Sequence, residues 1–286
     1  MLHKMELIHD LFTHFPQAVI GGLAIAVTCS ILGVFVILKR VVFIGIVLSE
    51  VAALGVAIAL VFHFHPFVGA SILTLASVLI LAFPYNSQRI PRDAILGIMF
   101  ILASSLSILL VSKSGFGLEE VKNLLYGDII FTTSSDLGII LGVMIPILLF
   151  MICFIRPVSY SFLDRDGARV LGINVTLWEL LFFFALGFCV SAASKTAGAL
   201  LVFCYLVIAP STGLLLSRKL VPAIIISVSA SVCATMIGML VALGKDIPTN
   251  QSIAVVSCAI LLITAAPLVV LPLFVRLKRK SHINSQ

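Results

Sequence analysis

Charged residues are scarce in this chain: Asp, Glu, Lys and Arg make up 10% of its 286 residues, whereas soluble domains carry about 25%. Hydrophobic residues account for 61% of the sequence, and the mean hydropathy is +1.26. This balance excludes a soluble globular protein and leaves no room for a separate soluble domain. It predicts a single transmembrane domain over residues 1–286, an all-α polytopic bundle of eight or nine membrane-spanning helices.

Nucleotide-binding motifs are also missing. The sequence has no G-x-x-x-x-G-K-[ST] phosphate loop and no G-x-G-x-x-G dinucleotide motif. We therefore expect a chain that is not an enzyme, has no ATPase site of its own and holds no permanently bound cofactor. Any ATP hydrolysis must come from a partner subunit.

The cysteines show neither a CxxC pair nor the spacing of a secreted disulfide framework. All six lie inside apolar segments, which predicts small buried hydrophobic side chains, with a soft-metal role for Cys204 as the alternative. The N-terminal residues 1–15 carry acidic residues and histidines, and no small-residue cleavage site follows the first apolar run. They predict an interfacial segment and not a removable signal peptide.

The net charge of +6 follows the order of the loops. Thirteen of the 18 basic residues fall in alternate loops, which the positive-inside rule places in the cytoplasm. These residues are Lys39, Arg40, Arg89, Arg92, Arg156, Arg165, Arg169, Arg218, Lys219, Arg276, Lys278, Arg279 and Lys280. The distribution predicts a multi-pass plasma-membrane protein with its N-terminus outside and a basic cytoplasmic tail at 276–286. It does not indicate nucleic-acid binding.

Apolar runs predict the spans. They are expected at 16–38, 42–62 (with Glu50 in the middle), 67–83, 94–112, 137–155, 180–193, 199–217, 222–243 and 253–274. A tight external turn is expected at 194–198. Residues 113–136 predict a short external helix and a partly re-entrant return, in which Asp128 and Asp136 are expected to cap helices in preference to contacting a partner.

The longest predicted cytoplasmic segment, 156–180, contains a short amphipathic pattern. Asp164 and Asp166 precede apolar residues, and Gly172 follows them, which is typical of a helix with acidic residues at its N-terminus and a glycine stop.

Three stretches together resemble one family. They are 32–60 (LGVFVILKRVVFIGIVLSEVAALGVAIAL), 162–175 (FLDRDGARVLGINV) and 196–217 (TAGALLVFCYLVIAPSTGLLLS). In order and spacing they are similar to the permease subunits of ATP-binding-cassette importers for zinc, manganese and iron. The resemblance covers nearly the whole chain.

The resemblance implies a homodimer of permeases in a bacterial inner membrane, with cytoplasmic ATPase subunits and an extracytoplasmic metal-binding protein. It also implies that residues 162–175 form a coupling helix seated in the ATPase, the alternative being a solvated amphipathic loop. The residues expected to contribute to that contact are Asp164, Arg165, Asp166, Ala168, Arg169, Val170, Leu171 and Gly172.

The second span departs from the family pattern. Many members carry Asp and His four residues apart, in a pattern like G-D-x-x-S-H, where this chain has Gly45, Ile46, Ser49 and Glu50. The pair that would share one helix face is therefore lost, and one carboxylate remains. Carboxylate ligands favour manganese or ferrous iron over zinc, although other spans can supply further ligands.

Glu50 is the principal site candidate, because a carboxylate at the centre of a span costs about 2.5–3.5 kcal/mol on insertion scales. It is either a metal ligand or polar gate on the dimer axis, or a buried carboxylate that hydrogen-bonds to another helix. His63 and His65 could guide an incoming ion or could simply be solvated. The residues expected to line the pathway are Ile46, Ser49, Cys204, Tyr205 and Ser211.

Three other functions remain open on the sequence alone. The first is a permease for cobalamin or ferric siderophores, which shares the coupling logic but does not need a lone central carboxylate. The second is an ion-coupled secondary transporter that uses Glu50 as a proton site. A membrane enzyme is the weakest, because no neighbouring His or Asp forms a catalytic constellation with Glu50.

Overall fold

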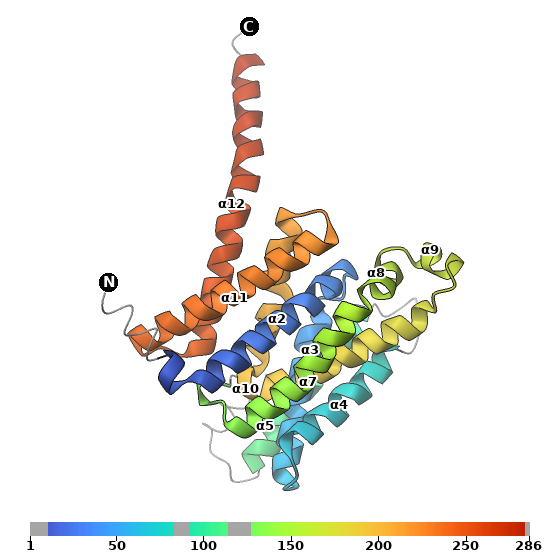
Figure 1. Cartoon of the computed structure of the whole chain (residues 1–286), viewed down its shortest axis with the longest axis vertical. Coiled ribbons are helices and arrows are strands. Elements are labelled where there is room, and N and C mark those ends of the chain that lie inside the picture. Colours follow the sequence, from blue (N-terminus) through green and yellow to red (C-terminus); the bar gives the residue numbers. More distant parts are fainter. Residues whose placement is uncertain (1–10, 83–91, 114–126, 284–286) are drawn as a thin grey trace.

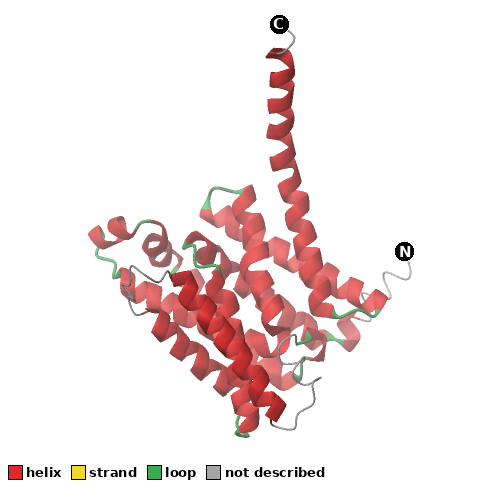
Figure 2. Cartoon of the chain, turned by 180° about the vertical axis from the view of Figure 1, so that it is seen from behind, coloured by secondary structure: helices red, strands yellow, loops and turns green. Residues whose placement is uncertain are grey.

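The structure is a computed structural model, and it describes the backbone at residues 11–82, 92–113 and 127–283 and the side chains at 11–81, 93–112 and 127–267. Most of the predicted interfacial segment, the predicted external helix near residue 120 and the side chains of the basic tail at 276–286 lie outside the described residues. Every regular element in the described part of the chain is helical (Figures 1 and 2).

Eleven elements make up the described part of the chain. They are α2 (Pro16–Leu38), α3 (Phe43–Val61), α4 (Pro66–Ala82), α5 (Arg92–Lys113), the 3-10 turn η1 (Ile129–Phe131), α7 (Ser134–Cys153), α8 (Ile155–Leu163), α9 (Arg165–Val170), α10 (Val175–Leu216), α11 (Leu220–Lys245) and α12 (Thr249–Ile283). Seven described helices are long and apolar enough to cross a membrane, and α4 is a shorter apolar helix. The predicted polytopic all-α fold is therefore confirmed.

Helix α10 is two helical segments joined at one glycine. Its 42 residues would extend about 63 Å, roughly twice the thickness of a hydrocarbon core. Gly198 leaves the helical conformation with φ 68° and ψ 162°, inside the stretch 194–198 where the sequence predicts a turn. Figure 1 shows the first half running from α9 toward the start of α12 and the second half returning toward the start of α11.

A second glycine makes the Gly198 turn possible. Gly127 has φ 51°, and a Cβ built on it would lie 2.7 Å from the Gly198 backbone nitrogen. The Asn250 side chain links these two backbone segments, because its amide group donates to the carbonyl oxygens of Gly127 (3.0 Å) and Ala197 (2.8 Å). The turn is held by close backbone approach and by one amide side chain.

The core forms around α10, which packs against α2, α3, α4, α7, α11 and α12. Small residues bring these helices into backbone contact, as is usual where lipid supplies no hydrophobic driving force between helices. A Cβ on Gly33 of α2 would overlap the Leu206 carbonyl group, and one on Gly213 would overlap the backbone of α11 at Ala223.

Aromatic rings fix α8 on the bundle. Phe162 of α8 packs against Phe182 of α10 with ring centroids 4.8 Å apart, and Phe35 of α2 lies 6.0 Å from Phe162. These contacts hold α8, and with it α9, at one end of the molecule. We call this the α9 end, and the opposite end, which carries the α3–α4 turn with His63 and His65, the histidine end.

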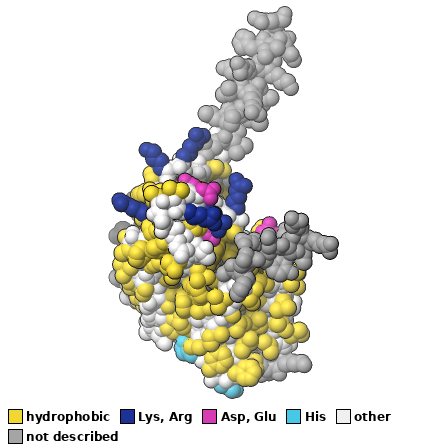
Figure 3. Space-filling view, turned by 90° about the vertical axis from the view of Figure 1, so that its right-hand side faces the viewer, with side chains coloured by type: hydrophobic (Ala, Val, Ile, Leu, Met, Phe, Trp, Pro, Cys, Tyr) yellow, Lys and Arg dark blue, Asp and Glu magenta, His cyan; other side chains and the backbone are white. Residues whose placement is uncertain are grey.

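The two ends differ in the side chains that they carry. Figure 3 shows Lys and Arg side chains gathered at one end of the visible face, His side chains at the other, and hydrophobic side chains between them. An apolar belt between two polar ends is the surface that a membrane-spanning bundle requires.

The prediction for the cysteines holds for half of them. Cys29, Cys189 and Cys204 are buried, whereas Cys153, Cys233 and Cys258 are exposed on the surface of the bundle, so burial was the wrong expectation for the latter three. Hydropathy cannot separate the two groups, because the packed face and the lipid-facing surface of a membrane helix are both apolar.

Candidate functional site

Glu50 lies in the middle of α3, which packs against α4, α5 and α10. Its side chain is partly buried, and the Ser104 side chain of α5 hydrogen-bonds to it. One carboxylate oxygen, Oε2, is shielded from solvent and makes no hydrogen bond within the described part of the chain. The carboxylate therefore combines the predicted hydrogen bond to another helix with one oxygen that is still available to a ligand.

The residues beside Glu50 in α3 contribute little ligand chemistry. The Ser49 hydroxyl is fully buried and donates to the Gly45 carbonyl oxygen at 2.9 Å, which satisfies it within its own helix. Ile46 lies one turn before Glu50 and packs against the hydrophobic core. Within the described residues, no group of three His, Cys, Asp or Glu side chains could hold a metal ion. In the described part of the chain, Glu50 is therefore not part of a cluster of metal ligands.

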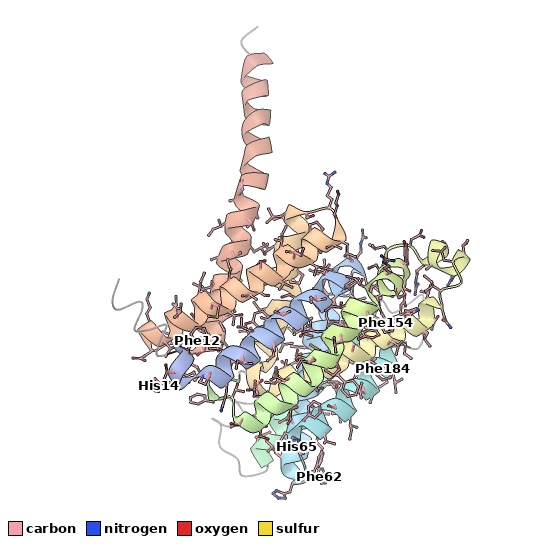
Figure 4. All side chains as sticks on the ribbon, viewed as in Figure 1. Phe12, His14, Phe62, His65, Phe154 and Phe184 are labelled. Atoms are coloured by element: carbon pink, nitrogen blue, oxygen red, sulfur yellow. The ribbon has the colours of Figure 1, made fainter. Side chains whose placement is uncertain are left out.

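The two histidines lie far from Glu50. His63 and His65 are exposed at the α3–α4 turn, about 20 Å from Glu50 at roughly 1.5 Å per helical residue. His63 has φ 57°, and the His65 Nδ1 accepts a hydrogen bond from the Phe67 backbone N–H at 3.3 Å. Figure 4 shows His65 and Phe62 at the tip of this turn. The structure does not bring these histidines into one site with Glu50.

The expected pathway residues of the second half of α10 lie in or against the core. Tyr205 is fully buried, and its hydroxyl lies 2.6 Å from the Thr235 hydroxyl of α11. Cys204 is 2% exposed, and the half-buried Ser211 donates to the Val207 carbonyl oxygen. Tyr205 therefore connects α10 to α11, and Cys204 lies in the core beside it; their place on an ion path stays a prediction.

The predicted amphipathic helix is present and shorter than the 162–175 range. Phe162 belongs to α8, Asp164 caps α9 by accepting from the Gly167 N–H at 2.9 Å, and Gly172 ends the segment at φ 75°. The extended backbone of Asp164, with φ −143° and ψ 86°, separates the two helices. Ala168 is buried, whereas Val170 is 89% exposed and Leu171 65% exposed. This leaves two exposed apolar side chains at the C-terminal tip of α9, a helix that lies at the edge of the molecule (Figure 1).

Glu179 is an important residue that the sequence does not single out. Its carboxylate accepts from Arg165 Nε at 3.0 Å and Nη2 at 2.8 Å, and it also forms an ion pair with Lys39. The contact with Lys39 joins residues far apart in the chain, so no local pattern could have revealed it.

Asp136 has two roles at the histidine end. It completes a capping box with Thr133 at the start of α7, as predicted, and Asp128 caps η1 by accepting from the Ile130 N–H. Asp136 also pairs with Lys195 of α10, with Nζ 2.5 Å from Oδ1. The capping follows from the local sequence, but the ion pair depends on how α7 and α10 pack.

Comparison with known proteins identifies the family. The sequence model of the ABC 3 transport family matches residues 12–267. The chain belongs to this family. It is a multi-pass permease subunit of the metal-transporting ATP-binding-cassette type, as the three stretches at 32–60, 162–175 and 196–217 indicate, and family membership implies ATPase and substrate-binding partners.

Individual relatives are distant but aligned over most of their length. The manganese transport system membrane protein MntC of Halalkalibacterium halodurans is 27% identical over 86% of this chain and 84% of its own. A probable iron transport system membrane protein of Haemophilus influenzae is also 27% identical, over 88% and 89%. The solved structure of PsaBC from Streptococcus pneumoniae superposes with a TM-score of 0.83 at 23% identity, covering 92% of this chain and 95% of that one, which supports the fold.

Proposed function

We propose that this chain is the membrane-spanning subunit of an importer that moves a divalent transition metal ion into the cytoplasm, energised by a separate ATPase. Manganese or iron is the expected cargo, with zinc as the third candidate. The observation that carries the proposal is Glu50, a lone carboxylate in an apolar span with one oxygen still available. Relatives that the chain matches over most of its length are named as manganese and iron transport proteins.

The proposed topology has nine crossings. The two halves of α10 count separately, and α4 adds to the longer spans. The α9 end, which carries Lys39, Arg165 and Arg218, is placed in the cytoplasm by the positive-inside rule. The N-terminus is then outside, the C-terminus is inside, and the histidine end faces the binding protein.

The proposed ion site is shared between two copies of the chain. One copy supplies a single carboxylate, and two Glu50 side chains meeting on a dimer axis would supply the oxygen ligands that manganese and ferrous iron prefer. His63 and His65 at the outer surface would pass the ion from the binding protein toward this site. No resident cofactor is required, because the metal is the cargo.

The proposed contact with the ATPase is α9. ATP-driven movement must act on a rigid, exposed element, and α9 presents Val170 and Leu171 beyond the charged side chains of Arg165, Asp166 and Arg169. The capped, glycine-terminated helix joins directly to α8 and α10, so that a push on it reaches two packed helices.

Uptake measurements with a matched pair of variants test this function. Vesicles containing the chain and its ATPase are loaded with ATP and offered radioactive manganese, iron or zinc together with the external metal-binding protein. Glu50→Gln keeps the shape of the side chain but removes the charge, and we expect uptake to fall at least about tenfold, the effect of losing about 1.4 kcal/mol of ion binding. Asp93→Asn, an exposed carboxylate on α5, is the control and should transport normally.

The alternatives give different results in the same vesicles. Full uptake by the Glu50→Gln variant would refute the role of this carboxylate. Uptake that needs no ATPase and is abolished by an uncoupler would indicate a secondary transporter. Uptake of cobalamin or a ferric siderophore, without uptake of free ions, would assign the chain to the chelate-transporting class.

A further inference from the structure

One carboxylate at the α9 end holds three elements together. Glu179, in the second turn of α10, receives a bidentate pair of hydrogen bonds from Arg165, the first residue of α9. It also pairs with Lys39, which follows the last residue of α2. The side chains of Glu179 and Lys39 are each 15% exposed, so this contact is mostly withdrawn from water.

Lys39 is fixed by more than this ion pair. Its Nζ lies 4.6 Å from the ring centroid of Phe162 and 5.7 Å from that of Phe183, which places it over aromatic faces of α8 and α10. Directly after Lys39 the chain turns through Arg40, with φ 59°, and enters α3, which carries Glu50. A displacement of Lys39 therefore acts on the entrance to the helix of the candidate site.

The first half of α10 carries a second charge contact near its other end, in which the Asp136 side chain is 13% exposed and that of Lys195 is 32% exposed. Lys195 pairs with Asp136 at 2.5 Å, and Asp136 belongs to the capping box that begins α7. Ala197, two residues after Lys195, accepts a hydrogen bond at its carbonyl oxygen from the Asn250 side chain of α12. The helix between Glu179 and Lys195 is about 24 Å long at roughly 1.5 Å per residue, enough to connect the two ends of the bundle.

We propose that the first half of α10 acts as a lever, that is, a rigid helix that moves as a unit when α9 moves. Glu179 is the positioning residue that links this helix to α9. The Lys195–Asp136 pair transmits that movement to α7 at the histidine end. This inference rests on the proposed function, because it assigns the residues that join ATP-driven motion of α9 to opening of the opposite end. A bidentate Arg–carboxylate pair suits this role, since it fixes orientation as well as distance.

The test measures ATP hydrolysis and manganese uptake in the same vesicles, which contain the permease and its ATPase and are supplied with the external metal-binding protein. Glu179→Gln should lower uptake per ATP hydrolysed at least about tenfold, with little change in the ATPase rate or in the KM for manganese. Glu179→Asp keeps the charge and should retain partial coupling. Arg218→Gln removes an exposed charge at the same end and serves as the control.

A double-mutant cycle separates a lever from two unrelated structural contacts. Asp136→Asn preserves a capping oxygen but weakens the pair with Lys195, and alone it should also lower uptake per ATP. If both contacts act in series, the double variant should be no worse than the more severe single variant. Multiplying losses, unchanged coupling in Glu179→Gln, or a parallel fall of ATPase and uptake would overturn the proposal.

Absence of metal uptake by the native complex would refute the proposed function. A conformational measurement would still test the lever in that case. Spin labels are attached at Phe131→Cys and Lys245→Cys, two exposed positions, in a chain whose exposed cysteines are replaced by Ser. ATP should change the distance between the labels in the otherwise native complex and should not change it in the Glu179→Gln variant. The same distance change in both would refute the lever.

Discussion

Gly55 of α3 and Gly69 of α4 bring the backbones of these two helices into direct contact. A Cβ built on Gly55 would overlap the Gly69 carbonyl group, and one built on Gly69 would overlap the Gly55 carbonyl oxygen. The contact lies just after Glu50 in α3, so it sets how closely α4 covers the helix that carries the candidate site. Small residues allow this approach because nothing but van der Waals packing holds membrane helices together at such a point.

Replacing Gly55 by Ala should separate α3 from α4. The added methyl group meets backbone atoms that cannot rotate away, and overpacking of this kind costs about 1–3 kcal/mol. We expect a lower unfolding temperature of the purified protein in detergent. Gly97→Ala on α5 is the matched control, because no described atom lies within 4 Å of a Cβ built there. Equal stability of the two variants would contradict the close packing of α3 and α4.

Gly198→Ala should disturb the turn between the halves of α10. The backbone of Gly198, with φ 68° and ψ 162°, lies in a region that is essentially restricted to glycine, so a side chain there costs about 1–3 kcal/mol, and the neighbouring Gly127 leaves little room for adjustment. The expected result is a less stable protein whose cleavage by protease near residue 198 is faster than in the native chain. Gly142→Ala, in an open position on α7, should behave like the native protein in both assays.

Tyr205→Phe separates a core role from a pathway role. The variant loses the hydrogen bond to Thr235, but Thr235 keeps its bond to the Ser231 carbonyl at 2.7 Å. We expect a loss of about 0.5–1.5 kcal/mol of stability and unchanged selectivity among manganese, iron and zinc in vesicle uptake. A change in metal preference with normal stability would instead assign the Tyr205 hydroxyl to the ion path.

Val170→Asp should weaken the contact with the ATPase. The side chain is 89% exposed, so the folded permease should tolerate the charge, but an apolar pocket on a partner would not. Co-purification of the ATPase with the variant should fall at least about tenfold, while Val170→Thr should retain most of it. Normal co-purification of the aspartate variant would exclude this tip of α9 from the interface.

Much of the helix pattern could be predicted because its cause is local. Apolar length fixes the spans: α2 was expected over its observed range, and α3, α4 and α7 shifted by only a few residues. The predicted turn between 194 and 198 is also local, since Gly198 adopts a conformation that other residues avoid. The prediction of a single helix over 162–175 was less accurate, because this stretch is divided between α8, α9 and the start of α10. Asp164 ends one helix and caps the next, and the local sequence does not distinguish that from a continuous helix.

Hydropathy and charge act residue by residue, so the amino-acid order was enough to identify an α-helical membrane protein with a costly carboxylate at Glu50. The packing of the helices was needed to find that Ser104 meets Glu50, that His63 and His65 lie at a distant surface, and that Glu179 binds both Lys39 and Arg165. These contacts depend on the rotation and spacing of packed helices. An apolar sequence encodes both only weakly, since its packed and lipid-facing surfaces have the same composition.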